Sequence, residues 1–201
     1  LSLIYPTEEN PVTIHLVTGT FSPLSNNETF PINLASNISL SGAGEGVTIL
    51  DAGGSAENQN RVITMENCIN NTISDLTITG GWTSSYGGGI YLDNASPTLS
   101  QITLEDNYAY WYGGGISLTD SDPILIDVMI RNNHADFSGG GVRAQNANLE
   151  LTRVTIDGNT VDPFTSGLSI NDGTLTLSHC TFINNEMYSY SSDITVSNTE
   201  F

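Results

Sequence analysis

The sequence repeats itself with a period of 26 residues, and this repeat constrains the fold more than any other feature. A Gly-Gly-Gly triplet followed by Ile or Val starts at residues 87, 113 and 139, and it decays to Thr-Ser-Gly-Leu at residue 165. Four more columns keep the same spacing: Leu99, Leu125, Leu151 and Leu177; Ile102, Val128, Val154 and Cys180; Leu104, Ile130, Ile156 and Phe182; Asn107, Asn133, Asn159 and Asn185. So many columns in one register indicate repeated structural units.

Each repeat reads as short strands joined by turns. Apolar residues alternate with polar ones, as in Ile102 to Leu104 and Val154 to Ile156, and this spacing is typical of strands. Paired hairpin-turn signals, which a blade of hairpins would need, are missing. We therefore predict an all-β, single-domain parallel β-helix of about seven coils with a 26-residue period. In such a solenoid every strand pairs with its copy one repeat later, about 4.8 Å away.

The beginning of the chain carries a less regular version of the pattern. We expect irregular N-terminal coils over residues 1–61 and regular coils over residues 62–201, all in one domain. Strands are predicted at Val12–Leu16, Ile38–Leu40 and Val47–Leu50. Ser22 to Pro31 is predicted to be a loop. The next member of the leucine column would fall just beyond Phe201, so we expect the sequence to be a fragment of a longer protein that continues at the C-terminus.

The asparagine column predicts a structural ladder made of Asn107, Asn133, Asn159 and Asn185. Gly81 holds the equivalent place in the preceding copy, and Gly and Asn share a tolerance of the left-handed backbone region. The pattern therefore favours a corner with positive φ at the ladder residues. Stacked amides can also hydrogen-bond from coil to coil and satisfy the backbone groups of the bend.

The charge balance excludes several partners. The chain has 22 acidic residues against four arginines and no lysine, and its net charge is −18. Such a chain repels phosphate backbones and anionic lipid headgroups, so we expect no nucleic-acid partner. No apolar run approaches the roughly 20 residues that cross a bilayer, so we expect no membrane insertion of this sequence.

Two of the four arginines fall in outward columns beside acidic residues. One column reads Glu105, Arg131, Asp157, and another reads Asp127, Arg153, His179. We interpret both arginines as members of ion-pair ladders rather than as catalytic bases. Thr77, Thr103, Thr155 and Thr181 form a third outward row of ordinary strand residues.

Signals for metals and reactive groups are weak. Cys180 falls in an inward column and Cys68 lies about four coils earlier at a corner, too far apart for a disulfide. His15, His134 and His179 show no zinc-ligand spacing, so no zinc site is expected. Asp120 and Asp122 offer hard oxygen ligands, and they are the candidate residues for calcium, the one possible cofactor. No catalytic residue is predicted.

Aromatic residues gather in the segment that joins each asparagine to the next glycine triplet. The candidates are Trp82, Tyr86, Tyr108, Tyr110, Trp111 and Tyr112. Because coils stack, these rings are predicted to line one edge of the solenoid as a strip. The strip either packs on itself to cover the corner or contacts a glycan or a protein, and the pattern leaves both readings open.

The repeat motifs resemble those of known proteins. The glycine triplets, together with Leu104-Glu-Asp-Asn107 and its copies, are similar to the GGA-I and F-x-x-N repeats of polymorphic outer-membrane proteins. The opening Thr13 to Phe21, with Leu40 to Gly44 and Thr48 to Asp51, is similar to the first coils of right-handed β-helix proteins of the pectate-lyase-like superfamily. The two resemblances cover nearly the whole chain.

The resemblance implies a right-handed β-helix that is secreted or displayed on a bacterial cell surface. We expect a structural and adhesive binding module, with a glycan or a surface protein of a host or neighbouring cell as its partner. The alternative is a polysaccharide lyase or glycoside hydrolase of the same superfamily. The even period leaves little chain for the walls of a cleft, and the net charge of −18 disfavours polyanionic substrates.

Overall fold

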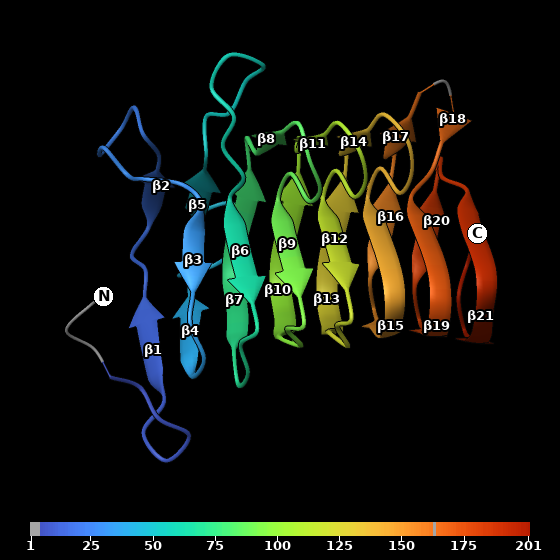
Figure 1. The fold of residues 1–201 in the computed structure, drawn as a ribbon, viewed down its shortest axis with the longest axis horizontal. Coiled ribbons are helices and arrows are strands. Elements are labelled where there is room, and N and C mark those ends of the chain that lie inside the picture. The colour runs from blue at the N-terminus through green and yellow to red at the C-terminus, as the bar shows by residue number, and fades with distance from the viewer. Residues whose placement is uncertain (1–4, 163) are drawn as a thin grey trace.

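The chain forms a parallel β-solenoid. The computed structural model describes residues 5–162 and 164–201. Figure 1 shows the strands stacked side by side along the long axis, with the N-terminal coils at one end and the C-terminal coils at the other. Every regular element of the described residues is a strand, so none of them forms a helix that could span a membrane.

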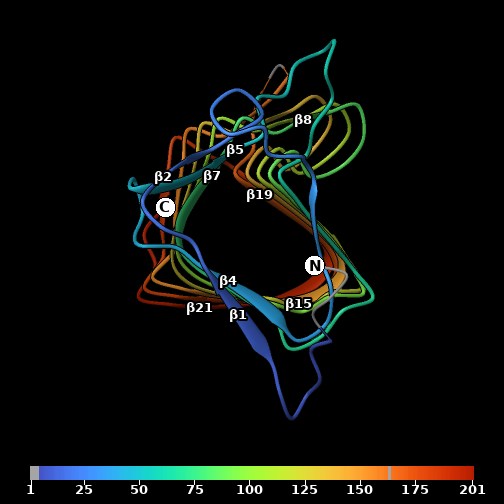
Figure 2. The same cartoon turned by 90° about the vertical axis from the view of Figure 1, so that its left-hand side faces the viewer.

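Three faces enclose the core, as the view along the axis shows (Figure 2). The first face contains β3 (Ile32–Leu34), β6 (Ile63–Glu66), β9 (Ile90–Asp93), β12 (Ile116–Thr119) and the first parts of β15 (Val142–Thr152), β19 (Leu168–Ser178) and β21 (Met187–Ser197). The second face contains β1 (Val12–His15), β4 (Ile38–Ser41), the first parts of β7 (Thr72–Thr79), β10 (Thr98–Glu105) and β13 (Ile124–Arg131), and the second parts of β15, β19 and β21.

A third face completes the coils, and the coils with β8 (Trp82–Thr83), β11 (Tyr108–Ala109), β14 (His134–Ala135) and β17 (Thr160–Val161) also have a ribbon at one corner. The third face contains β2 (Gly19–Phe21), β5 (Thr48–Asp51), the second parts of β7, β10 and β13, β16 (Thr155–Asp157) and β20 (Thr181–Ile183). This narrow ribbon, here called the corner ribbon, contains β8, β11, β14, β17 and β18 (Phe164–Thr165). It lies between the third and the first face.

Strand register confirms the 26-residue period. On the second face Thr72, Thr98, Ile124, Glu150 and Thr176 pair in succession at steps of 26. Earlier steps vary from 26 to 33 residues on this face. Along the second face there are seven successive strand pairings, and along each of the other two faces there are six. The solenoid therefore has six to seven turns.

The last coil is shorter than the repeat predicts. Leu168 pairs with Met187 and Leu177 with Val196, which are steps of 19 residues. The seven missing residues are those of the corner ribbon, because the chain runs from Asn185 directly into β21. The leucine column therefore continues at Val196, and the expectation that its next member falls beyond Phe201 is wrong.

The inward columns form one continuous apolar core. The leucine column is at most 1% exposed from Ile73 to Leu177, and Cys180 is 1% exposed in the column where it was predicted. Cys68, which was predicted to lie at a corner, is also buried, and this burial raises the pKa of its thiol. Both cysteines are free.

Left-handed residues turn the chain at each corner. Between the second and third faces the residue with positive φ is Asp75, Gln101, Asp127, Arg153, His179 and finally Asn198. The predicted column of Asp127, Arg153 and His179 faces outward as expected, and it lies at this bend. For the asparagine ladder the prediction is wrong in one respect: positive φ belongs to the residue before each ladder position, such as Asp106 and Asn132, and not to the ladder residue itself.

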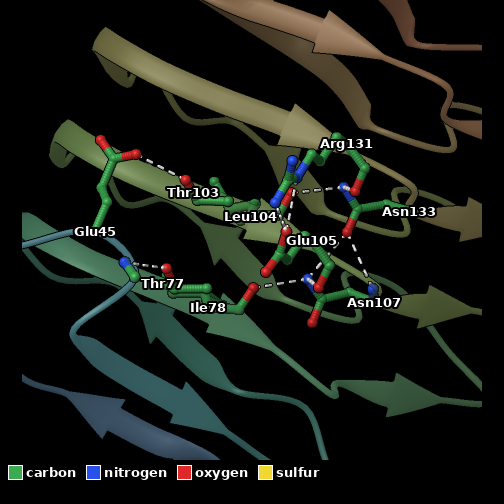
Figure 3. Close-up of polar contacts among 10 residues, drawn as sticks. Glu45, Thr77, Ile78, Thr103, Leu104, Glu105, Asn107, Arg131 and Asn133 are labelled. Carbon is green, nitrogen blue, oxygen red and sulfur yellow. Dashed lines mark hydrogen bonds and ion pairs between the residues drawn. The ribbon is translucent and has the colours of Figure 1, made fainter. Parts of the chain in front are cut away.

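The asparagine ladder is confirmed by its hydrogen bonds (Figure 3). The backbone N–H of Asn107 donates to Oδ1 of Asn133 over 3.1 Å, and the N–H of Asn133 donates to Oδ1 of Asn159 over 3.0 Å. Nδ2 of Asn133 donates to the carbonyl oxygen of Leu104 in the preceding coil and to Oδ1 of Asn159. Because Asn133 is fully buried, each of these groups would otherwise lack a partner.

The glycine triplets allow the corner ribbon to lie on the first-face strands. A Cβ atom at Gly114 would come within 2.3 Å of the carbonyl oxygen of His134 and within 2.5 Å of that of Gly140. Gly88 and Gly140 face the ribbon in the same way. The triplet is thus required by backbone contact, and its first glycine, as at Gly113, also has positive φ.

Each predicted ion-pair ladder is present as a single pair between an arginine and the acidic residue of the preceding coil, and among the described residues neither continues to Asp157 or His179. Arg131 Nη2 lies 2.6 Å from Glu105 Oε2, and Arg153 Nε lies 2.6 Å from Asp127 Oδ1. The hydrogen bond from Arg153 lowers the pKa of Asp127 below its ordinary value. The arginines of both pairs are about half exposed, so solvent screens the pairs and they contribute little to stability.

The threonine row is less exposed than predicted. The loop between β4 and β5 covers its first members: Thr103 Oγ1 donates to Glu45 Oε2 over 2.7 Å, and the N–H of Gly46 donates to Thr77 Oγ1 (Figure 3). Thr77 and Thr103 are consequently buried, whereas Thr155 is half-buried.

Replacement of a ladder asparagine tests the interior hydrogen bonds. We expect Asn133→Ala to lower the free energy of unfolding by roughly 1–3 kcal/mol, because buried backbone and side-chain groups lose their partners. Urea denaturation measures this change. The control is Asn58→Ala at an exposed loop position; equal stabilities of the two variants would contradict the ladder.

Two glycine variants separate backbone contact from backbone conformation. Gly114→Ala places Cβ against two carbonyl oxygens, whereas Gly46→Ala adds Cβ in open space at a φ of +73°. We expect Gly46→Ala to cost about 1 kcal/mol of left-handed strain and Gly114→Ala to cost clearly more. Melting temperatures of both variants test this, and equal melting temperatures would show that the ribbon is not held by the triplets.

Candidate functional site

The predicted aromatic strip lies on the corner ribbon as a set of stacked rings. Trp82 stacks on Tyr108 with centroids 4.8 Å apart, and Tyr108 stacks on His134 at 5.5 Å. Tyr86 stacks on Tyr112 at 5.5 Å in the turn that follows. The strand register explains both stacks, because residues 26 positions apart lie directly above one another.

A third group covers the outside of this corner. Trp111 stacks on Phe137 with centroids 4.6 Å apart, and Tyr110 packs edge-on against both rings. These three side chains are 39%, 50% and 41% exposed, respectively. Together with the two stacks they form what we call the aromatic edge: Trp82, Tyr86, Tyr108, Tyr110, Trp111, Tyr112 and Phe137. The structure thus brings together all six residues that the sequence predicted.

The inner part of the aromatic edge is partly buried. Trp82, Tyr108 and Tyr112 are only half-exposed because neighbouring coils cover their ring faces. Burial, and then the adjacent Asp136 carboxylate, raise the pKa of Tyr108 to about 12.

Next to the aromatic edge, the first face carries an outward column of alternating large and small residues. Tyr91, Ser117, Arg143, Ser169 and Tyr188 occupy equivalent positions in successive coils. Ser117 and Ser169 are buried although they point outward, because the larger side chains of the adjacent coils cover them on both sides. The column therefore has two low points, one on each side of Arg143.

Each low point is the floor of a hollow. The first hollow has a volume of about 230 Å³ and is walled by Tyr86, Tyr91, Tyr112 and Gln145 around Ser117. The second has a volume of about 500 Å³ and is walled by Phe137, Tyr188 and Tyr190 around Ser169. Tyr112 and Arg143 line both hollows, so the two form one surface feature, which we call the groove.

The groove contains a guanidinium that forms no ion pair among the described residues, although the Asp172 carboxylate lies near enough to act on it. Arg143 lies over the ring of Tyr112, 5.6 Å from its centroid, and its Nη2 donates to Gln145 Oε1 over 2.8 Å. Arg61 lies over Tyr91 and donates to the carbonyl oxygens of Tyr86 and Gly87, so it fastens the turn beside the first hollow. Burial lowers the pKa of both arginines from the ordinary value. Within the described part of the chain neither forms an ion pair, unlike Arg131 and Arg153.

Asp120 and Asp122, the candidate calcium ligands, lie at the corner between the first and second faces. Asp120 has positive φ, and its Oδ1 accepts a hydrogen bond from Nδ2 of Asn146 in the next coil. Asp122 Oδ1 accepts from the backbone N–H of Asn148 over 2.6 Å and from its Nδ2 over 3.1 Å. Amide groups thus stabilise both carboxylates, and their role in binding calcium stays a prediction.

The groove was not predicted from the sequence, although most of its residues follow the same period. Arg143 aligns with Tyr91, Ser117 and Ser169 at steps of 26, a signal that was available in the sequence. Tyr188 and Tyr190 could not be placed in this way, because the shortened last coil moves them from the corner to the first face. Their position depends on the 19-residue step.

Comparisons with known proteins agree with this architecture. The family model described as "right handed beta helix region" matches residues 27–201. A pectin methylesterase solved with a hexasaccharide is similar over 98% of this chain and 86% of its own, with a TM-score of 0.56 and 10% identity. The A-module of a mannuronan C-5 epimerase from Azotobacter vinelandii has 13% identity and a TM-score of 0.20 over 96% of this chain and 91% of its own. No curated protein matches the sequence with statistical significance.

The likeness to the pectin methylesterase, at 10% identity, concerns the fold alone. The match of the family model covers most of the chain and includes all the regular coils. This chain belongs to the right-handed β-helix family.

Proposed function

We propose that this chain is an exported, surface-displayed β-helix that binds glycans in the groove and along the aromatic edge. The observation that carries the proposal is the column on the first face, in which Ser117 and Ser169 form two hollows on either side of Arg143. Binding sites for small organic groups combine apolar and aromatic walls with a few polar groups that fix orientation. The groove has this composition.

The chemistry of the walls fits pyranose rings. Such rings have apolar C–H faces that pack on aromatic side chains, and hydroxyl groups that hydrogen-bond at their rims. Tyr86, Tyr112 and Tyr188 supply aromatic surfaces, while Arg143 and Gln145 supply donors and an acceptor close to them. Arg143 already shares a hydrogen bond with Gln145, so its guanidinium is held in place before a ligand arrives.

The spacing of the hollows favours an oligosaccharide over a single sugar. Ser117 and Ser169 are two coils apart, which corresponds to roughly 10 Å along the axis. This distance is comparable to the length of one disaccharide. A linear oligosaccharide that lies along the axis would therefore place one sugar in the first hollow and the sugar two positions further along in the second hollow. The exposed rings of Trp111 and Phe137 then extend the contact onto the aromatic edge.

The charge of the protein limits the class of glycan further. The net charge of −18 repels polyanions at long range, and Arg143 provides one local positive charge. We therefore expect neutral or sparsely charged glycans. Export and surface display are supported by the resemblance of the repeats to those of polymorphic outer-membrane proteins, and a glycan of a host or neighbouring cell would be the partner.

An arginine pair tests the groove. We expect Arg143→Gln to weaken binding to glycan-array hits at least tenfold, or about 1.4 kcal/mol, because the guanidinium contacts both hollows. Arg131→Gln makes the same charge change in an exposed ion pair on the third face and should leave binding unchanged. Wild-type-like binding by Arg143→Gln, or no binding of any glycan by the wild type, would contradict the proposal.

A second pair tests the aromatic edge. Trp111→Ala removes a ring that is 39% exposed, and we expect it to weaken glycan binding about tenfold, again about 1.4 kcal/mol. Tyr5→Ala removes an aromatic ring that is 84% exposed outside the edge and serves as the control. Titration of a fluorescent oligosaccharide measures both, and identical affinities would limit the ligand to the groove.

Product analysis distinguishes binding from the enzymatic alternative. The wild-type protein is incubated with the glycans it binds and with acidic polysaccharides in the presence of calcium. We expect chain lengths to stay constant. New unsaturated ends, detected by ultraviolet absorbance, or new reducing ends would show that the protein is a lyase or a hydrolase.

A further inference from the structure

A cluster of metal-ligating side chains lies on the corner ribbon, outside the groove. His134 Nε2 is 3.2 Å from Asp136 Oδ1, and one ligand atom each of His134, Asp136 and Asp162 lies within 4.8 Å of the other two. The register of β14 and β17 places Thr160 over His134, and the same register carried one residue past Val161 places Asp162 over Asp136. Folding thus brings together residues whose spacing in the sequence predicts no site.

The histidine is oriented by its surroundings. His134 Nδ1 lies 2.7 Å from Thr160 Oγ1, and its ring lies flat on Tyr108 with an interplanar angle of 13°. A metal-binding histidine typically bonds its second ring nitrogen to a partner that fixes the ring. With Thr160 at Nδ1, the other nitrogen, Nε2, faces the carboxylate of Asp136.

Among the described residues no arginine pairs with either carboxylate, and the imidazole of His134 is the one basic group beside them. Asp136 and Asp162 lie one coil apart, and the arginine ion pairs of the described residues involve Glu105 and Asp127 instead. Asp162 is exposed, whereas Asp136 and His134 are half-buried, so an ion from solvent can reach all three. A divalent cation would relieve the repulsion and bond all three side chains at once.

We propose that His134, Asp136 and Asp162 bind a divalent transition-metal ion of the zinc or manganese type. An imidazole nitrogen with two carboxylate oxygens suits such ions, whereas calcium takes oxygen ligands. Three protein ligands leave at least one coordination position for water or another ligand. The site differs in place and chemistry from the all-oxygen pair Asp120 and Asp122, and it does not depend on glycan binding.

Zinc titration of the whole chain tests the site. Isothermal titration calorimetry should show one Zn²⁺ per wild-type molecule. Asp162→Asn keeps the size of the side chain, and His134→Phe keeps a ring for stacking on Tyr108; each should weaken zinc binding at least tenfold. Asp193→Asn and His179→Phe, at exposed positions in other coils, are the matched controls and should bind zinc like the wild type.

Three outcomes would overturn the proposal: no zinc binding by the wild type at millimolar Zn²⁺, wild-type affinity in Asp162→Asn, or tighter binding of Ca²⁺ than of Zn²⁺. Circular dichroism verifies that each variant is folded. If His134→Phe does not fold, Asp162→Asn decides alone. Glycan affinity is measured on separate samples, so the zinc site and the glycan groove can fail independently.

Discussion

Parallel stacking in register is the constraint on which the rest of this structure depends. Because each strand pairs with its copy in the next coil, a residue and its equivalents share one backbone conformation and one environment. A left-handed bend in one coil, as at Asp127, therefore requires a left-handed bend in all. The same rule turns single buried groups into columns, as with Asn107 and Asn133, where each asparagine supplies the hydrogen-bond acceptor for the coil before it.

Stacking also determines what the surface can display. The glycine triplets bring the corner ribbon into backbone contact with the first face, so the side chains of the ribbon project beside the groove instead of covering it. Two of the four arginines balance acidic residues in exposed pairs, while Arg61 and Arg143 lie against tyrosine rings of the first face. In a chain of net charge −18, this division concentrates the unpaired cations of the described residues on one side.

A candidate site could be predicted from the sequence only where its residues recur with the 26-residue period. The aromatic edge was predicted because Trp82, Tyr108 and their neighbours recur between the asparagines and the glycines. The cluster of His134, Asp136 and Asp162 was not, since one of its ligands comes from a different coil and the spacing carries no metal motif. Its residues meet only because β14 and β17 pair in that register.

The sequence by itself determined the solenoid, its 26-residue period, the inward columns and the asparagine ladder, because each is a local pattern repeated along one axis. Only the tertiary structure decided the positions of residues in the segments that depart from the 26-residue period. The 19-residue last step places Tyr188 on the groove, and the loop that carries Glu45 buries Thr103. These features depend on contacts between segments of different length, and a periodic pattern contains no information about such contacts.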